Sequence, residues 1–227
     1  MKTRSIFILL FCIFCVSVKS FAQDVDSIIV QHTDKKGEVN VDSVLQSANY
    51  LLYSNPEQAM KLTRQINSIA AKQRDPIQLA HTFQFLGICF SAVEANYDSA
   101  FHYFDRAEQL YKENPSDAAT LGMGRIMHNS GTIREIQGDY LQAIEFYIKA
   151  LELFDKINDM KTRPYTLNNL ATLYSTFTMY EKAEKYAREC INLAEKSGKR
   201  SFAGNRKSEF NRYFDAKRRA RKSISLF

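Results

Sequence analysis

Apolar residues recur along residues 41–198 with the three-and-four spacing of helices that bury one face. Capping and turn residues interrupt this spacing at intervals, which indicates separate helices rather than one long helix. The ranges expected to be helical are 42–54, 56–73, 76–94, 97–113, 117–137, 140–157, 161–177 and 180–197. Only 8 glycines and 4 prolines occur in 227 residues, which disfavours a turn-rich barrel or sandwich. The pattern predicts an all-α fold.

Several of these helices are preceded by residues that can satisfy free backbone N–H groups. Asn55–Pro56 and Asp75–Pro76 each place a capping residue before a proline, which suits the first position of a helix. Asp139 and Thr178 are each followed three residues later by Gln or Glu, the spacing of a capping box. These local signals predict the starts of four helices.

The expected helices repeat as pairs. Residues 129–153 and 169–193 agree in kind when they are laid 40 residues apart, with a small residue, an aromatic residue and an alanine at matching places. Residues 86–110 fit the same pattern with one extra residue in the turn, and a worn copy precedes them around residues 50–66. Because one helical hairpin cannot bury its apolar face alone, the copies are expected to stack.

The recurring positions resemble those of the tetratricopeptide repeat (TPR), in a long-helix form. The residues that carry the resemblance are Gly87, Phe90, Ala100, Phe104 and Ala107 in the second copy, Gly131, Gly138, Tyr140, Ala143, Tyr147 and Ala150 in the third, and Ala171, Tyr174, Tyr180 and Ala183 in the fourth. The family's tryptophan position instead holds Phe83, Met127 or Leu167, and the period is 40 or more residues where the family has 34. The resemblance implies a right-handed solenoid of about four antiparallel helical hairpins.

The resemblance also implies a binding surface, because ligands of such solenoids lie along the concave face that the first helix of each repeat lines. The groove positions expected here are His81, Gln84, Ser91, Arg125, His128, Thr132, Glu135, Tyr165, Asn168, Thr172 and Ser175. This polar lining suits a protein or peptide ligand. Only Arg125 supplies a cation, so capture of a free C-terminal carboxylate is not expected. The alternative for His81 and His128 is a solvated polar side chain with no ligand.

The first 22 residues have the pattern of a secretory signal peptide. Met1–Arg4 carries positive charge, an apolar run extends from Ile6 to Val18, and Ser20 and Ala22 suit a cut before Gln23. The alternative is an uncleaved N-terminal anchor. Cleavage would leave residues 23–40 as an N-terminal linker before the repeats, and would make the protein periplasmic or secreted.

The C-terminal residues 199–227 differ from the repeats in charge. They hold ten basic and two acidic residues, in a chain whose formal net charge is +6. Phe210, Phe214 and Ile224 fall on one helical face, so residues 208–225 are predicted to form an amphipathic capping helix over the last hairpin. The alternative is a basic tail that contacts an anionic membrane surface. Nucleic acid is not an expected partner of an exported chain.

The sequence contains no recognisable nucleophile elbow, phosphate-binding glycine loop or zinc motif, so neither a cofactor nor a metal is expected. Cys89 and Cys190 are expected to stay unpaired because they lie two repeats apart. We interpret the chain as a non-catalytic, extracytoplasmic protein- or peptide-binding scaffold in a signalling or regulatory assembly, similar to the sensory part of bacterial TPR-containing regulators. The alternatives are a surface-associated structural component that contacts anionic membrane through its tail, and an enzyme with a helical-repeat body.

Overall fold

The structure is a computed structural model in which residues 25–196 are described. Within that range the chain forms nine helices, and an isolated β-bridge pairs Thr33 with Val39. The helices are α2 (Val25–Gln31), α3 (Val41–Ser54), α4 (Pro56–Gln73), α5 (Pro76–Val93), α6 (Tyr97–Glu113), α7 (Asp117–Ile136), α8 (Tyr140–Lys156), α9 (Arg163–Thr176) and α10 (Tyr180–Lys196). The eight helices predicted in the repeat region are all present, with ends within two residues of the expected ones.

Three of the predicted caps form as expected. The side chain of Asn55 accepts a hydrogen bond from the backbone N–H of Gln58, that of Asp75 from two N–H groups of α5, and that of Asp139 from Gln142. Thr178 differs from the capping prediction, because its φ of 60° places it in the left-handed region of the turn before α10. Its backbone carbonyl there accepts a hydrogen bond from the N–H of Tyr180.

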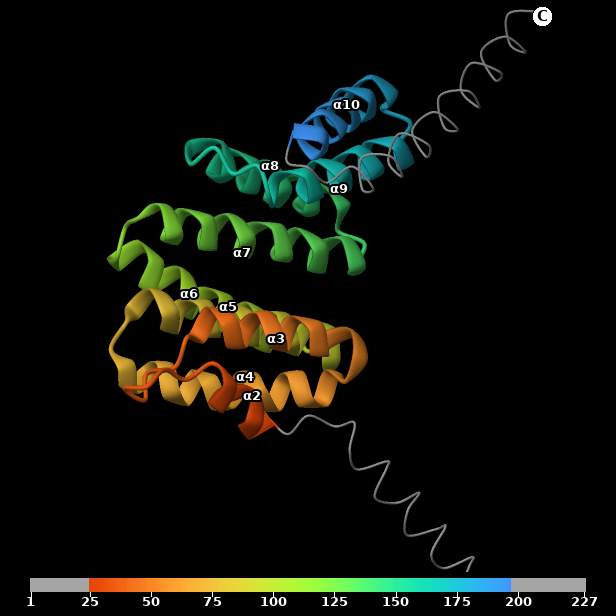
Figure 1. The fold of residues 1–227 in the computed structure, drawn as a ribbon. Coiled ribbons are helices and arrows are strands. Elements are labelled where there is room, and N and C mark those ends of the chain that lie inside the picture. Colours follow the sequence, from red (N-terminus) through yellow and green to blue (C-terminus); the bar gives the residue numbers. More distant parts are fainter. Residues whose placement is uncertain (1–24, 197–227) are drawn as a thin grey trace, which may run out of the picture.

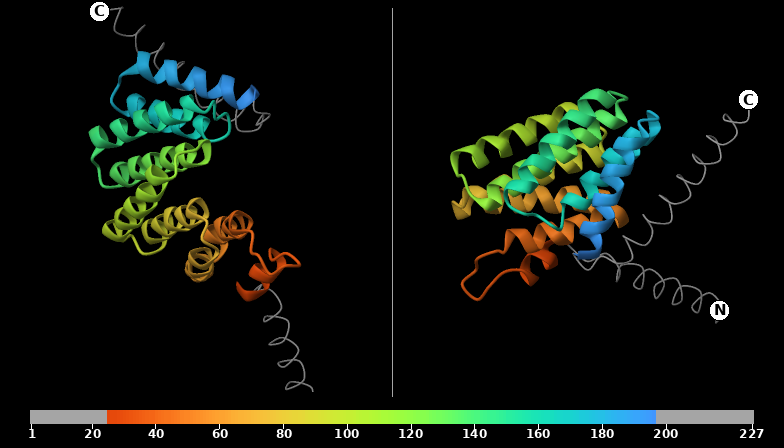
Figure 2. Two further views of the ribbon diagram at one scale, coloured as in Figure 1. Left: turned by 90° about the vertical axis from the view of Figure 1, so that its left-hand side faces the viewer. Right: turned by 90° about the horizontal axis from the view of Figure 1, so that it is seen from above.

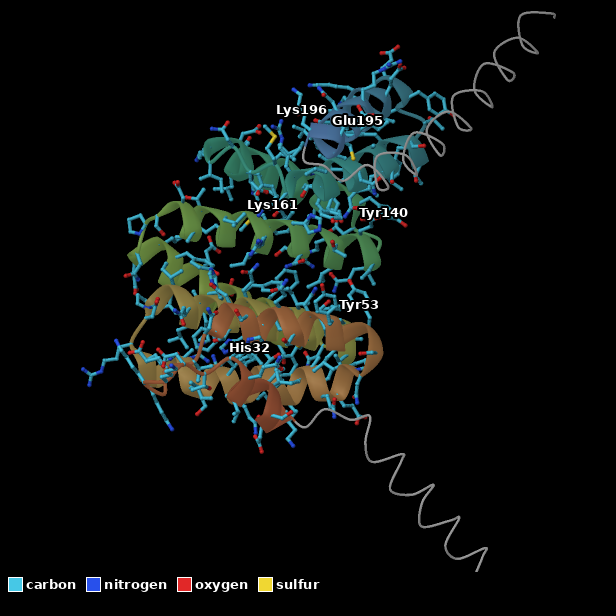
Figure 3. All side chains as sticks on the ribbon, viewed as in Figure 1. His32, Tyr53, Tyr140, Lys161, Glu195 and Lys196 are labelled. Carbon is cyan, nitrogen blue, oxygen red and sulfur yellow. The ribbon has the colours of Figure 1, made fainter. Side chains whose placement is uncertain are left out.

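The helices pair as four antiparallel hairpins, α3–α4, α5–α6, α7–α8 and α9–α10, which follow one another along the described part of the chain as a solenoid (Figures 1 and 2). The first helices of neighbouring hairpins also touch, α3 against α5 and α5 against α7. Tyr53, near the end of α3, and Tyr140, just after the end of α7, lie at the same edge of the stack (Figure 3). The first helices therefore run in one direction, which brings side chains of α3, α5 and α7 onto a shared face.

Within the second and third hairpins, a glycine on the first helix faces an aromatic ring on the second. A Cβ at Gly131 would lie 2.7 Å from ring atoms of Tyr147, and a Cβ at Gly87 would overlap the ring of Phe104. Both rings are buried. The two backbones can approach this closely only because these glycines have no side chain, so the glycine–aromatic pairs set the spacing of the hairpins.

The buried apolar residues form two groups along the solenoid. The larger extends from α2 to α7, and the smaller joins α8, α9 and α10. Cys89 belongs to the first group and Cys190 to the second. By length and composition α5 is, among the described helices, apolar enough to cross a membrane. It instead packs against α3, α4, α6 and α7, as the central helix of a core does.

Part of the segment predicted as an N-terminal linker has a defined structure. Helix α2 packs on α3 and α4 with Val25 and Ile28 buried, and the imidazole Nε2 of His32 lies 3.2 Å from the hydroxyl of Ser47 (Figure 3). The segment from residue 25 to 40 therefore packs against the first hairpin and covers the start of the solenoid. The predicted signal peptide 1–22, its cleavage point and the basic tail 199–227 with its capping helix lie outside the described residues.

Candidate functional site

A groove of about 670 Å³ lies between the first helices of the first three hairpins. Its lining is Asp42, Leu45, Gln46 and Asn49 from α3, His81, Gln84, Phe85 and Ile88 from α5, and Ala118, Leu121 and Arg125 from α7. On α3 and α5 these residues follow the same spacing of i, i+3, i+4 and i+7, which places them on one side of each helix. First helices that run in the same direction and present the same stripe to the groove thus produce one continuous surface.

The polar end of the groove is built around a pair that joins two hairpins. Nδ1 of His81 lies 2.7 Å from Oδ1 of Asp42, although the two residues are 39 positions apart in the chain. This hydrogen bond lowers the pKa of Asp42, and the positive charge of Arg125 lowers it further, against the opposing effect of burial. Asp42 is therefore a carboxylate at neutral pH. The pair ties α3 to α5 at the groove.

The floor of the groove is mainly apolar. Leu45 and Phe85 are almost completely buried, and Ile88 and Leu121 are partly exposed beside them. Gln84 is also buried, and its Oε1 accepts a hydrogen bond of 3.2 Å from the hydroxyl of Tyr111. Gln84, one of the predicted groove residues, is thus fixed beneath the groove by its hydrogen bond to Tyr111.

This arrangement combines an apolar floor with a rim of amide, carboxylate, imidazole and guanidinium groups. Such a surface can hold an apolar side chain and, at the same time, hydrogen-bond a peptide backbone or polar side chain. In residues 25–196 no group of three or more His, Cys, Asp or Glu side chains is placed to hold a metal ion.

Three of the other predicted groove residues belong to a polar network between the third and fourth hairpins. Nδ1 of His128 lies 2.8 Å from the hydroxyl of Thr166, and burial lowers the pKa of His128 to about 4. The hydroxyl of Tyr147 donates to Oε2 of Glu135 at 2.8 Å and lies 3.2 Å from the hydroxyl of Thr132. A further bond of 3.2 Å comes from Nδ2 of Asn169 on α9. The network joins α7, α8 and α9 and does not line the groove.

The remaining predicted positions lie away from the groove. Ser91 is near the end of α5, and Tyr165, Asn168, Thr172 and Ser175 are on α9. Tyr165 is 43% exposed, while the hydroxyl of Thr172 donates to the carbonyl of Asn168 within the helix. The structure thus brings together His81, Gln84 and Arg125 of the predicted set, and places the others on the network or on α9.

The prediction missed the whole contribution of α3, and with it Asp42, Gln46 and Asn49. The first copy of the repeat is worn, so its positions could not be aligned with those of the later copies. A usable signal was nevertheless present, because residues 42, 45, 46 and 49 have the same spacing as residues 81, 84, 85 and 88.

The comparisons with known proteins agree with this architecture. A tetratricopeptide repeat family model matches residues 122–196, whereas no curated protein sequence matches the chain. Aspartyl phosphate phosphatase F from Bacillus subtilis has a similar structure, with a TM-score of 0.61 and 17% identity over 82% of this chain and 51% of the phosphatase. This chain therefore spans about half the length of that protein.

Two further solved structures are similar at low identity. A signal transduction ATPase with numerous domains and a tetratricopeptide repeat sensor, from Pyrococcus horikoshii, has a TM-score of 0.59 and 16% identity over 82% of this chain and 31% of its own. BtubC from P. vanneervenii has a TM-score of 0.53 and 16% identity over 90% of this chain and 94% of its own. Residues 122–196 thus match the tetratricopeptide repeat, and the described residues as a whole adopt a TPR-like solenoid.

Proposed function

We propose that this protein is an extracytoplasmic, non-catalytic scaffold that binds a protein or peptide segment in the groove between α3, α5 and α7, as part of a regulatory assembly. The observation that carries the proposal is the groove itself, which joins an apolar floor to a hydrogen-bonding rim. TPR-like solenoids are typically interaction scaffolds rather than enzymes. Each of the three hairpins contributes one helix, so a bound segment would contact three hairpins at once.

Two similar structures support the regulatory part of the proposal. One is an aspartyl phosphate phosphatase and the other a signal transduction ATPase whose tetratricopeptide repeats are described as a sensor. In the ATPase this chain's fold corresponds to about a third of the protein.

Partner capture with matched variants tests the groove. Gln46 and Asn49 are exposed on its rim, so Gln46→Ala with Asn49→Ala should weaken capture of a specific partner while the helical circular dichroism signal is unchanged. The control is Lys149→Ala with Lys185→Ala, which changes two exposed residues on the second helices α8 and α10. If the control variant loses the partner and the groove variant keeps it, the groove is not the binding surface.

A second pair of substitutions asks whether the bound segment extends beyond the groove. Tyr165→Ala with Asn168→Ala changes the predicted positions on α9, outside the groove lining. Loss of the same partner would extend the binding surface over the fourth hairpin. Retention would restrict it to α3, α5 and α7.

The extracytoplasmic location has a separate test. The pattern of Ser20 and Ala22 predicts that the exported protein begins at Gln23. N-terminal analysis of protein from the cell envelope or medium should find this residue first. Recovery of the chain in the cytoplasmic fraction with Met1 retained would contradict export.

A further inference from the structure

Asp42, His81 and Arg125 form a row across the three first helices that line the groove. His81 and Arg125 are equivalent positions, because each stands six residues before the glycine, Gly87 or Gly131, that faces the aromatic ring of its hairpin. Asp42 is next to His81 through their 2.7 Å hydrogen bond. Arg125 acts on the same carboxylate through its charge. The charged groups of the groove therefore lie close together, at matching positions along the three first helices.

The two charged ends of this row differ in how they are satisfied. Asp42 already has a hydrogen-bond partner in His81. Among the described residues, no ion pair or hydrogen bond engages the guanidinium of Arg125, which stands exposed at the groove beside Leu121. Arg125 thus keeps all five of its N–H donors available to a ligand.

A partner that covers the groove must remove water from both Arg125 and the apolar floor. Burying an unpaired guanidinium carries a large desolvation cost, whereas a carboxylate can pair with it through two parallel hydrogen bonds. The apolar floor gains stability by receiving an apolar side chain, because its residues Ile88 and Leu121 are partly exposed to water. The covered groove is therefore complementary to an acid beside a large apolar residue.

We infer that the groove selects a segment of another protein that presents an aspartate or glutamate side chain to Arg125 next to a large apolar side chain on the floor. This inference rests on the proposed function and specifies its partner. Charge argues against the chain's own C-terminal segment as the occupant, because residues 199–227 hold ten basic and two acidic residues and would bring like charge to Arg125.

A synthetic peptide library tests this selection on the purified full chain. The probe is a set of nine-residue peptides with leucine at the centre, one position two to four residues away that is Glu, Gln or Lys, and random residues elsewhere. Peptides retained by the immobilised protein are identified by mass spectrometry. Retention should favour Glu over Gln by about fivefold, the ratio that corresponds to about 1 kcal/mol, and should disfavour Lys.

Substitutions test whether Arg125 causes the preference for Glu. Arg125→Gln should reduce the Glu-to-Gln ratio to about one while leucine-containing peptides are still retained, because the apolar floor is unchanged. Arg64→Gln is the matched control, since Arg64 is 58% exposed on α4, outside the groove lining, and it should keep the preference.

The outcomes separate this inference from the proposed function. Retention of peptides with no preference for Glu, or a preference that survives Arg125→Gln, would overturn the acidic partner and leave the groove as a binding surface. A preference for Lys would overturn the acidic partner. It would indicate that Asp42 selects a basic segment, such as residues 199–227. Absence of retention of any peptide, together with partner capture that ignores the groove variants, would overturn both.

Discussion

Replacement of Gly131 by leucine should destabilise the solenoid, because α7 and α8 lie in close contact at this residue. A Cβ there would lie 2.7 Å from Cδ1 and Cε1 of Tyr147 and 3.2 Å from the carbonyl oxygen of Ala143. Tyr147 is fully buried, and its hydroxyl is hydrogen-bonded to Glu135 and Asn169. The ring therefore cannot swing away without breaking those bonds.

The magnitude follows from two opposing effects. Overpacking of a well-packed interior costs about 1–3 kcal/mol and occasionally more, and leucine adds three carbons beyond the Cβ that already overlaps the ring. The higher helix propensity of leucine returns somewhat less than about 1 kcal/mol. We expect the free energy of unfolding to fall by about 2 kcal/mol, which for a chain of this size lowers Tm by about 4–8 °C.

Urea unfolding followed by circular dichroism measures this change. Glu145→Leu is the control, because it places the same side chain on the exposed side of α8 and should change stability by less than about 0.5 kcal/mol. If Gly131→Leu unfolds at the same urea concentration as the wild type, the close glycine–tyrosine contact is wrong, and with it the packing of the third hairpin.

Three further predictions test the interior. Tyr147→Phe removes the hydroxyl that joins Glu135 and Asn169, and should cost about 1–3 kcal/mol in urea unfolding; an unchanged midpoint would mean that the network adds nothing. Burial lowers the pKa of His128 to about 4, below the value of about 6.5 in an unfolded chain, so the unfolded state binds the proton first. Stability should fall by up to about 3 kcal/mol between pH 6.5 and 4, and equal pH slopes for wild type and His128→Gln would contradict this. Burial also raises the pKa of Cys89 to about 11, so iodoacetamide should modify it at least about a hundredfold more slowly in the native protein than in urea, as mass spectrometry can measure.

The sequence by itself determined the helices and their pairing. Asn55, Asp75 and Asp139 begin helices as predicted, because a cap needs only the backbone N–H groups of the next three residues. The glycines Gly87 and Gly131, which occupy matching places in the repeat, lie at close contacts inside two hairpins. These features are local or repeat with the period of the chain, so they can be read from residue type and spacing.

The position of the groove was decided by the tertiary structure. Asp42 and His81 are 39 residues apart in the chain, and their hydrogen bond exists only because α3 and α5 pack side by side. Equivalent repeat positions also differ in what they contact. Gln84 and His128 each stand three residues before the glycine of their hairpin, yet Gln84 lines the groove whereas His128 bonds to Thr166 on α9. The angle between successive hairpins decides which side chains are covered, and that angle is the sum of many contacts between distant residues, none of which the repeat pattern specifies.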